Sequence, residues 1–302
     1  MMKRVLLFAA TNIAILLAIS IVLSLLGIGG YRLPGGGLDY GALMVFCLLW
    51  GMVGSFISLQ LSRWMAKRMT GLQLVDGQSG HEEADWVYRT VERLAAQAQL
   101  PMPEVGIYNS PEVNAFATGP SKSRSLVAVS TGLLRGMRRE ETEAVLAHEV
   151  SHIRNGDMVT MTLIQGVVNA FVMFASIVVA NIVRQMLQGN RDERSGGGGG
   201  GGYMIEFMVR MVLQVAFGFL GMFVVGWFSR SREFRADAGA ASLTGRQGMI
   251  AALRRLQGTQ ALIDNHEPAL ATMKISGGKS WLALASTHPP LEERIAALES
   301  LR

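Results

Sequence analysis

Residues 147–152 of the chain read Ala-His-Glu-Val-Ser-His. They lie in a run from about Glu140 to Arg154 whose spacing predicts a helix, and residues four apart in a helix share one face. His148 and His152 should therefore converge on one point. Two neutral imidazoles at this spacing suit Zn2+, which prefers nitrogen, sulfur and carboxylate ligands in a tetrahedron. The alternative is a pair of polar side chains near the surface.

Glu149, which follows the first histidine, is the candidate general base. Bound Zn2+ lowers the pKa of a coordinated water from about 15.7 to near 7, so that a neighbouring carboxylate can accept its proton. Val145, Leu146 and Val150 give the same helix an apolar side, which predicts that the motif is buried and not part of a loop.

The composition indicates a membrane protein. Half of the 302 residues are hydrophobic, and the mean hydropathy is positive. The net charge is +5, but Lys and Arg are scattered beside apolar runs and form no block, which argues against nucleic-acid binding. Cys47 is the only cysteine, so an intramolecular disulfide is excluded.

Four apolar runs are long enough to cross a bilayer: residues 5–28, 41–61, 158–183 and 211–228. The first run exceeds the apolar part of a signal peptide, about 7 to 15 residues, so we expect a retained anchor. Basic residues before the first run and after the second place both ends of this hairpin in the cytosol. The last two runs either cross fully, which we favour, or form a hairpin against the catalytic domain.

The predicted organisation has four parts. Residues 1–66 form a transmembrane hairpin, and residues 67–157 form the first part of a catalytic domain. Residues 158–229 form a second transmembrane pair with a Gly-rich loop at 185–202, which we expect to be flexible. Residues 230–302 complete the catalytic domain. The fold class is an α+β membrane protein, mostly helical, with a zincin-like catalytic domain that combines a small β-sheet with the histidine-bearing helix.

The segment before the motif predicts a helix and a small sheet. The helical spacing runs from Glu82 to Gln99, and short apolar strands are expected at Glu104–Tyr108 and Ser125–Ser130. Between them, residues 114–119 are expected to form a third, edge strand.

Asn114, Ala115 and Phe116 begin this edge strand and are candidate substrate-binding residues. In zinc peptidases with a small sheet before the metal-binding helix, an edge strand can pair with an extended substrate. An ordinary turn beside the sheet is an equally weighted alternative.

Glu233 is the candidate third metal ligand. A polar helix is expected to open at about Ser229, directly after the last apolar run, and Glu233 and Asp237 share one face of it. A two-histidine zinc site needs a third protein ligand, and a carboxylate from a separate helix can supply it. Asp237 is then placed to accept the outer N–H of a zinc-bound histidine. The alternative is an exposed helix with ion pairs to nearby arginines.

Taken together, these features resemble the HtpX-type membrane zinc metalloproteases and, more remotely, the CAAX prenyl endopeptidases. The resemblance covers nearly the whole chain and depends on the transmembrane hairpins, residues 114–117, 148–152, 233–237 and 287–294. It implies that His148, His152 and Glu233 bind one Zn2+ per chain and that Glu149 is the base. The seven-glycine insert is not accounted for by the family motifs.

The resemblance also implies an activity and a place. The expected activity is cleavage of damaged or misfolded membrane proteins as part of a stress response. The expected location is the bacterial inner membrane, with the catalytic domain facing the cytoplasm. The matching His and Arg of such proteases approach the cleft, so His288 and Arg294 are candidates for stabilising the oxyanion. Alternatively, residues 287–290 are only a cap and turn before a helix at Leu291–Leu301, with Leu301 among its inward-facing residues.

Dependence on ATP is not expected. Residues 278–280 resemble the end of a phosphate-binding loop, but the glycine required five residues earlier is Met273. The expected partners are therefore the lipid bilayer and membrane-protein or unfolded polypeptide substrates, with no nucleic acid and no ATP. Two rival functions are a non-catalytic zinc-containing scaffold or holdase and a transporter. The absence of charges at the centres of the apolar runs argues against transport.

Overall fold

The computed structural model describes residues 37–189, 200–266 and 288–301, together with residues 21, 24–25 and 31–33. The chain divides into two compact units. The helical unit comprises the residues up to Ile57 with Thr162–Val225, and the sheet unit comprises Ser58–Met161 with Gly226–Arg302.

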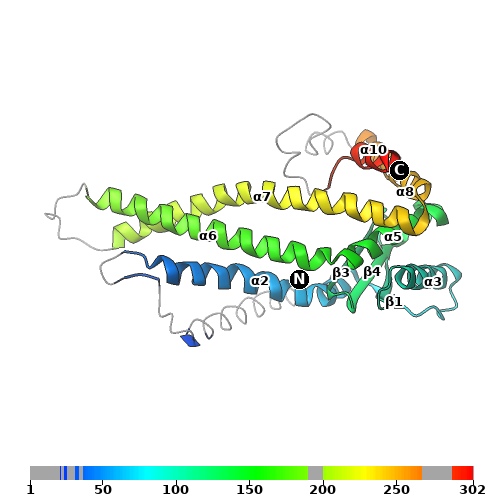
Figure 1. Ribbon diagram of the computed structural model, residues 1–302, viewed down its shortest axis with the longest axis horizontal. Helices are drawn as coiled ribbons and strands as arrows, with labels where there is room; N and C mark the ends of the chain where they lie inside the picture. The colour runs from blue at the N-terminus through cyan, green and yellow to red at the C-terminus, as the bar shows by residue number, and fades with distance from the viewer. Residues whose placement is uncertain are drawn as a thin grey trace. The chain divides into compact units, whose positions relative to one another are not determined.

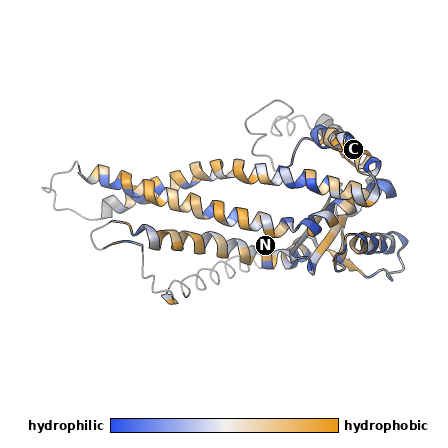
Figure 2. Cartoon of the chain, in the orientation of Figure 1, coloured by the Kyte–Doolittle hydropathy of each residue, from blue (hydrophilic) through white to orange (hydrophobic). Residues whose placement is uncertain are grey.

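Parts of three long helices make up most of the described helical unit (Figure 1): α2 (Tyr40–Thr70), α6 (Asp157–Gly189) and α7 (Gly200–Thr244). Their length and apolar composition suffice to cross a membrane, and Figure 2 shows apolar residues along all three. Large side chains such as Phe171 and Val212 are exposed, as is usual where lipid and not water is the solvent. The first predicted span, residues 5–28, lies almost wholly outside the described residues.

Small residues let α6 approach its two neighbours closely. A Cβ atom added to Gly51 of α2 would lie 2.4 Å from the backbone oxygen of Gly166, and one added to Gly221 of α7 would lie 2.7 Å from Val168 Cγ1. Close approach at small residues is typical of helix packing in membranes, where dispersion contacts and not water exclusion hold helices together.

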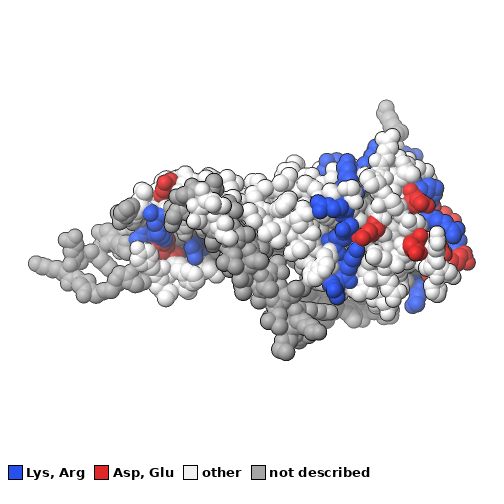
Figure 3. Space-filling view, turned by 90° about the horizontal axis from the view of Figure 1, so that it is seen from below, with Lys and Arg blue, Asp and Glu red and all other residues white. Residues whose placement is uncertain are grey.

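Charged side chains are sparse in the parts of these helices that belong to the helical unit and dense on the sheet unit (Figure 3). One buried group within the helical unit is an exception: Glu206 of α7 forms ion pairs with Arg184 of α6, at 3.0 Å, and with Arg32. The observed pairs join separate segments, so a charge that would be costly in lipid is neutralised.

The bounds of the apolar runs differ from the prediction. Both ends of the loop predicted at 185–202 are helical, because α6 continues to Gly189 and α7 begins at Gly200; residues 190–199 lie outside the described residues. The polar helix expected to begin at Ser229 is not separate, since α7 runs through this point to Thr244. The change from apolar to polar residues marks a change of surroundings and does not end the helix.

The sheet unit contains a four-stranded sheet of order β1-β2-β4-β3. The parallel central strands are β2 (Glu104–Tyr108) and β4 (Arg124–Ser130), and the antiparallel edge strands are β1 (Gln73–Val75) and β3 (Ala115–Ser121). The predicted edge position of β3 is confirmed. Strand β1 was not predicted, because three residues show no alternation.

Strand β3 is regular only over its first part. Ala115–Thr118 pair with β4 in register, and the register shifts between Thr118 and Ser121. At this shift Gly119 has φ 144°, and a Cβ atom there would lie 2.2 Å from the Arg124 oxygen. Only glycine fits such a position.

Within the described ranges, five helices accompany the sheet: α3 (Glu82–Gln97), α4 (Thr131–Gly136), α5 (Arg139–Asn155), α8 (Arg246–His266) and α10 (Leu291–Ser300). Helix α3 ends two residues earlier than predicted, and α4 was not predicted. The inward position predicted for Leu301 is wrong, since that residue is 41% exposed while Ile295 and Leu298 are buried.

Helix α5 lies at the centre of the sheet unit and is buried over most of its length. It begins at a capping box, in which the backbone N–H of Arg138 donates to Glu141 Oε2 at 2.9 Å. It ends at Gly156, whose φ of 71° is left-handed and reverses the chain before Asp157 starts α6. The predicted helix at 140–154 is therefore present, one residue longer at each end.

Candidate metal centre

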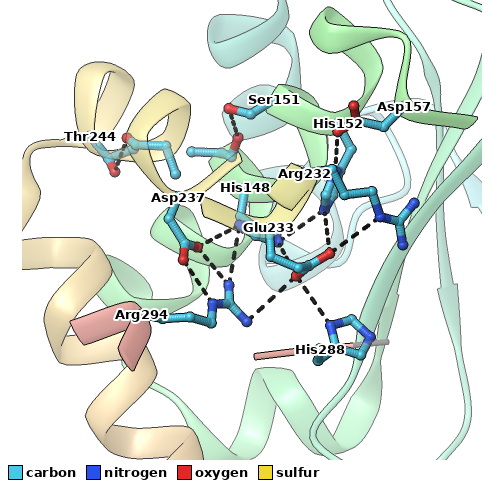
Figure 4. Close-up of polar contacts among 12 residues, drawn as sticks. His148, Ser151, His152, Asp157, Arg232, Glu233, Asp237, Thr244, His288 and Arg294 are labelled. Atoms are coloured by element: carbon cyan, nitrogen blue, oxygen red, sulfur yellow. Dashed lines mark hydrogen bonds and ion pairs between the residues drawn. The ribbon is translucent and has the colours of Figure 1, made fainter. Parts of the chain in front are cut away.

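The two histidines of α5 point at each other from one face of the helix (Figure 4). The Nε2 atoms of His148 and His152 lie 3.1 Å apart, and both side chains are buried. The four-residue spacing brings them together, as the sequence predicted.

Glu233 of α7 completes a cluster with these histidines. Its carboxylate oxygens lie 3.5 Å from His148 Nε2 and 3.5 Å from His152 Nε2, and its side chain is 1% exposed. A close approach of α7 to α5 makes this contact possible: a Cβ atom added to Gly239 would lie 2.6 Å from Ser151 Oγ. The structure thus brings together the three residues expected to bind a metal.

The donor set of this cluster fits a cation. Each histidine directs its Nδ1 atom at a carboxylate, which assigns the Nδ1 proton, so that the neutral ring, the form that binds a metal, presents Nε2 as a lone pair. Two lone pairs and a carboxylate then face one point, and Glu233 Oε1 is buried without a hydrogen bond. Four ligands about 2.0–2.1 Å from a tetrahedral Zn2+ would be about 3.4 Å apart, close to the separations found here.

Asp237 lies behind His148, one helical turn beyond Glu233. Its Oδ1 is 2.9 Å from His148 Nδ1, the contact expected of a residue that orients a metal-binding imidazole. Arg294 of α10 donates to both of its oxygens, at 2.6 and 2.7 Å. Its Nη1 lies 3.6 Å from Glu233. In this position Arg294 holds Asp237; its predicted role as an oxyanion donor stays a prediction.

Asp157 lies behind His152, and sequence reasoning missed it. Its Oδ2 is 2.7 Å from His152 Nδ1, and the residue is 1% exposed. The other oxygen lies 3.6 Å from the largely exposed Arg235. Gly156 is the sequence feature that could have revealed it. A glycine directly after a predicted helix often reverses the chain direction, so that the following residue can contact the last turn of that helix.

The charges around His148 favour a cation. Burial alone would lower the pKa of His148, but its bonds to Asp237 and Glu233 outweigh this effect and raise the pKa to about 9. Burial likewise acts to lower the pKa of Arg294, and the contact with Asp237 reverses it, so that the pKa is raised. The pocket therefore stabilises a positive charge at the point where the histidines meet.

Glu149 is buried beside His148 and is 9% exposed. Within the described part of the chain its carboxylate forms no hydrogen bond or ion pair, unlike the carboxylates of Glu233, Asp237 and Asp157. Its predicted role as the general base stays a prediction.

His288 reaches the cluster from the segment before α10. Its Nδ1 atom lies 3.1 Å from Glu233 Oε2, and its side chain is 63% exposed. It therefore stands between the buried cluster and solvent, where a group that contacts substrate is expected. The segment with Met273 and residues 278–280, on which the argument about ATP depends, lies outside the described residues.

Asn114 is fixed to the end of β4 by its backbone. Its N–H donates to Ser130 Oγ at 3.1 Å, and its carbonyl oxygen accepts from the Ser130 N–H at 3.0 Å. Ala115 and Phe116 follow in β3, opposite Val129 and Ala128. The predicted substrate-binding residues thus begin the edge strand, and no described strand pairs with its outer side.

A cation site made of His148, His152 and Glu233, with the buried Glu149 beside it, suits peptide hydrolysis. Three helices of the described chain are able to cross a bilayer, which indicates the membrane-bound class of metalloproteases. The sequence profile of peptidase family M48 matches residues 81–302, and the chain belongs to this family. It is therefore a metalloprotease and an integral membrane protein, and the family implies a metal.

Several relatives match over their whole length. A protein named "Protease HtpX homolog" from Verminephrobacter eiseniae is 52% identical, with 99% of each chain covered. "Protease HtpX" from Idiomarina loihiensis is 51% identical, with 100% of each chain covered. The crystal structure of S. mikatae Ste24p matches with a TM-score of 0.64 and 19% identity, covering 99% of this chain and 64% of that one. This last likeness shows a shared fold.

Proposed function

We propose that the chain is an ATP-independent zinc endopeptidase of the bacterial inner membrane that cleaves misfolded or damaged membrane proteins. One observation carries the proposal: the Nε2 atoms of His148 and His152 and the carboxylate of Glu233 converge within 3.5 Å, while the Nδ1 atom of each histidine faces another carboxylate. Such a set holds a divalent cation, and two imidazoles with one carboxylate suit Zn2+.

When bound, Zn2+ would activate a water molecule and polarise the scissile carbonyl. Glu149 would accept the proton of that water and return it to the leaving amine. Asp237 and Asp157 would keep the Nδ1 protons of the two histidines in place, so that both lone pairs stay aimed at the metal. His288, and Arg294 if it can reach past Asp237, would donate to the oxygen that becomes negative.

The edge of β3 would align the substrate. An extended peptide paired with Ala115–Thr118 would gain backbone hydrogen bonds of the kind that β4 makes on the other side. This recognition depends on the backbone and not on side chains, which suits a protease with many damaged substrates.

Three observations support the proposed substrate class and orientation. The relatives named Protease HtpX match over the whole chain, and three helices have the length and composition of membrane spans. Arg63, Lys67 and Arg68 follow the apolar part of α2 and favour the cytoplasmic side for the sheet unit. Substrates would be segments already unfolded, because the chain has no complete ATP-binding motif.

The decisive experiment compares wild-type protein with Glu149→Gln, purified in detergent without nucleotide. Wild type should cleave casein and a destabilised membrane protein, and Glu149→Gln should lose more than about a hundredfold in rate while keeping its zinc by elemental analysis. Exposed Glu83→Gln serves as the matched control. Zinc-loaded wild type that cleaves neither substrate would instead favour the non-catalytic scaffold or holdase.

A further inference from the structure

Gln165 and Asn169 form a polar pair on α6. Gln165 Nε2 donates to Asn169 Oδ1 at 2.8 Å in an exposed hydrogen bond; Asn169 is exposed and Gln165 is half-buried. Both residues lie within the candidate span Asp157–Leu187. Counted from Thr162, where the helical unit's part of α6 begins, a rise of 1.5 Å per residue places Gln165 about 5 Å and Asn169 about 11 Å along the helix.

The pair belongs to neither of the packed faces of its helix. Helix α6 contacts α2 at Gly166 and Ala170 and contacts α7 at Val168 and Val172. At 100° per residue, positions 165 and 169 project between these two faces. Among the described residues, the bond between the two amides is the only one that either side chain makes.

This bond leaves much of the hydrogen-bonding capacity of the pair unused. Asn169 retains both amide N–H groups, and Gln165 retains one N–H group and its carbonyl oxygen. Where such groups face hydrocarbon, water cannot satisfy them, so a neutral partner with both donor and acceptor groups is favoured. Their lack of charge gives no preference for an ionised partner.

We propose that this face of α6 binds a membrane-spanning segment of the substrate through a neutral polar side chain buried in that segment, such as Asn, Gln, Ser or Thr. The inference rests on the proposed function and specifies its substrate class. A correctly assembled membrane protein hides such side chains against its own helices, whereas an unassembled or misfolded one exposes them to lipid. The pair would thus select damaged proteins by the polarity of their spans.

Binding can be tested separately from cleavage. In vesicles, the Glu149→Gln variant is mixed with one of two labelled single-span peptides that differ only at a central Asn or Leu, and binding is followed by energy transfer. We expect the Asn peptide to bind about three- to tenfold more tightly. The preference should vanish in the Gln165→Leu/Asn169→Leu variant. It should persist in Ser176→Ala, because the Ser176 hydroxyl already donates to Val172 within its own helix.

Three results would overturn the proposal: equal binding of the two peptides, a preference that survives in the double leucine variant, or an occupant from the protein itself. If a segment of the protein itself covers the polar pair, a disulfide should form between Asn169→Cys and Asn12→Cys in one chain, or between two copies of Asn169→Cys. A binding preference without any cleavage of casein by the wild type would keep this inference and contradict the proposed function. Cleavage of casein without a preference for the Asn peptide would keep the proposed function and contradict this inference.

Discussion

The two histidines of the metal cluster are oriented by carboxylates of different origin. His148 is held by Asp237, which belongs to another helix and is itself held by Arg294 of a third. His152 is held by Asp157, five residues further along the chain, whose nearest cation is 3.6 Å away and mostly exposed. The same contact is thus built once by tertiary packing and once by a local turn.

This difference predicts different costs of failure. Loss of Asp237 leaves the buried Arg294 with only its longer, 3.6 Å contact to Glu233 and removes a side chain that joins three helices. Loss of Asp157 leaves no buried cation behind and affects mainly the ring it orients. We therefore expect the first carboxylate to control stability as well as metal binding, and the second to control metal binding alone.

The largest effect is expected for Asp237→Leu. The free energy of unfolding should fall by about 3–5 kcal/mol, because Arg294, 7% exposed, loses its bidentate partner. Titration of mixed micelles with a denaturing detergent would measure it. In the double variant Asp237→Leu/Arg294→Leu, much of the loss should be recovered. If the single and double variants are equally unstable, the comparison between the two carboxylates fails.

Gly239→Ala tests the packing that brings Asp237 to His148. The new methyl group would lie 2.6 Å from Ser151 Oγ and 2.9 Å from Ser151 Cβ, so α7 must move away from α5 at a cost of about 1–3 kcal/mol. The same unfolding assay and the bound zinc should both report this change. Ser151→Gly in the same protein removes the obstacle and should restore both; no restoration would contradict the explanation.

Asp157→Ala should weaken zinc binding by about 10- to 100-fold, with little loss of stability. Without the carboxylate, the Nδ1 proton of His152 is no longer fixed, and the lone pair is less often directed at the metal. Competition with a chromogenic chelator would measure the affinity, and Asp157→Asn, which keeps an acceptor, should fall in between. An unchanged affinity would remove Asp157 from the metal centre.

The smallest effect is expected for Arg235→Ala. Its side chain is 59% exposed and lies 3.6 Å from Asp157, and ion pairs of this kind contribute less than about 1 kcal/mol. Zinc affinity should change less than about fivefold in the chelator assay. A larger loss would mean that the second carboxylate, like the first, depends on a cation.

The sequence was sufficient for features that depend on local spacing. The helix with His148 and His152, the strand Glu104–Tyr108 and the edge position of β3 all follow from periodicity and turn residues. The proximity of Glu233 to the histidines was inferred because a two-histidine zinc site needs a third protein ligand, and the 3.5 Å contacts agree with this inference.

Features that depend on the course of the chain were not predicted. Asp157 lies beside His152 only because Gly156 adopts a left-handed conformation, and nothing in the spacing of polar residues shows that. The continuity of α7 through Ser229 was missed because a change of solvent along a helix resembles a boundary. Strand β1 has three residues, too few for any pattern.

The irregularity at Gly119 sets a limit on what the outer edge of β3 can hold. Beyond Thr118 the register of the strand shifts, so a substrate peptide could pair regularly with only about four residues of β3, or roughly 13 Å of strand. A footprint this small gives little affinity and little discrimination among sequences. The enzyme would cleave any polypeptide segment that reaches the site in an extended conformation. The rate of turnover would then depend on how often a short segment of the substrate protein unfolds.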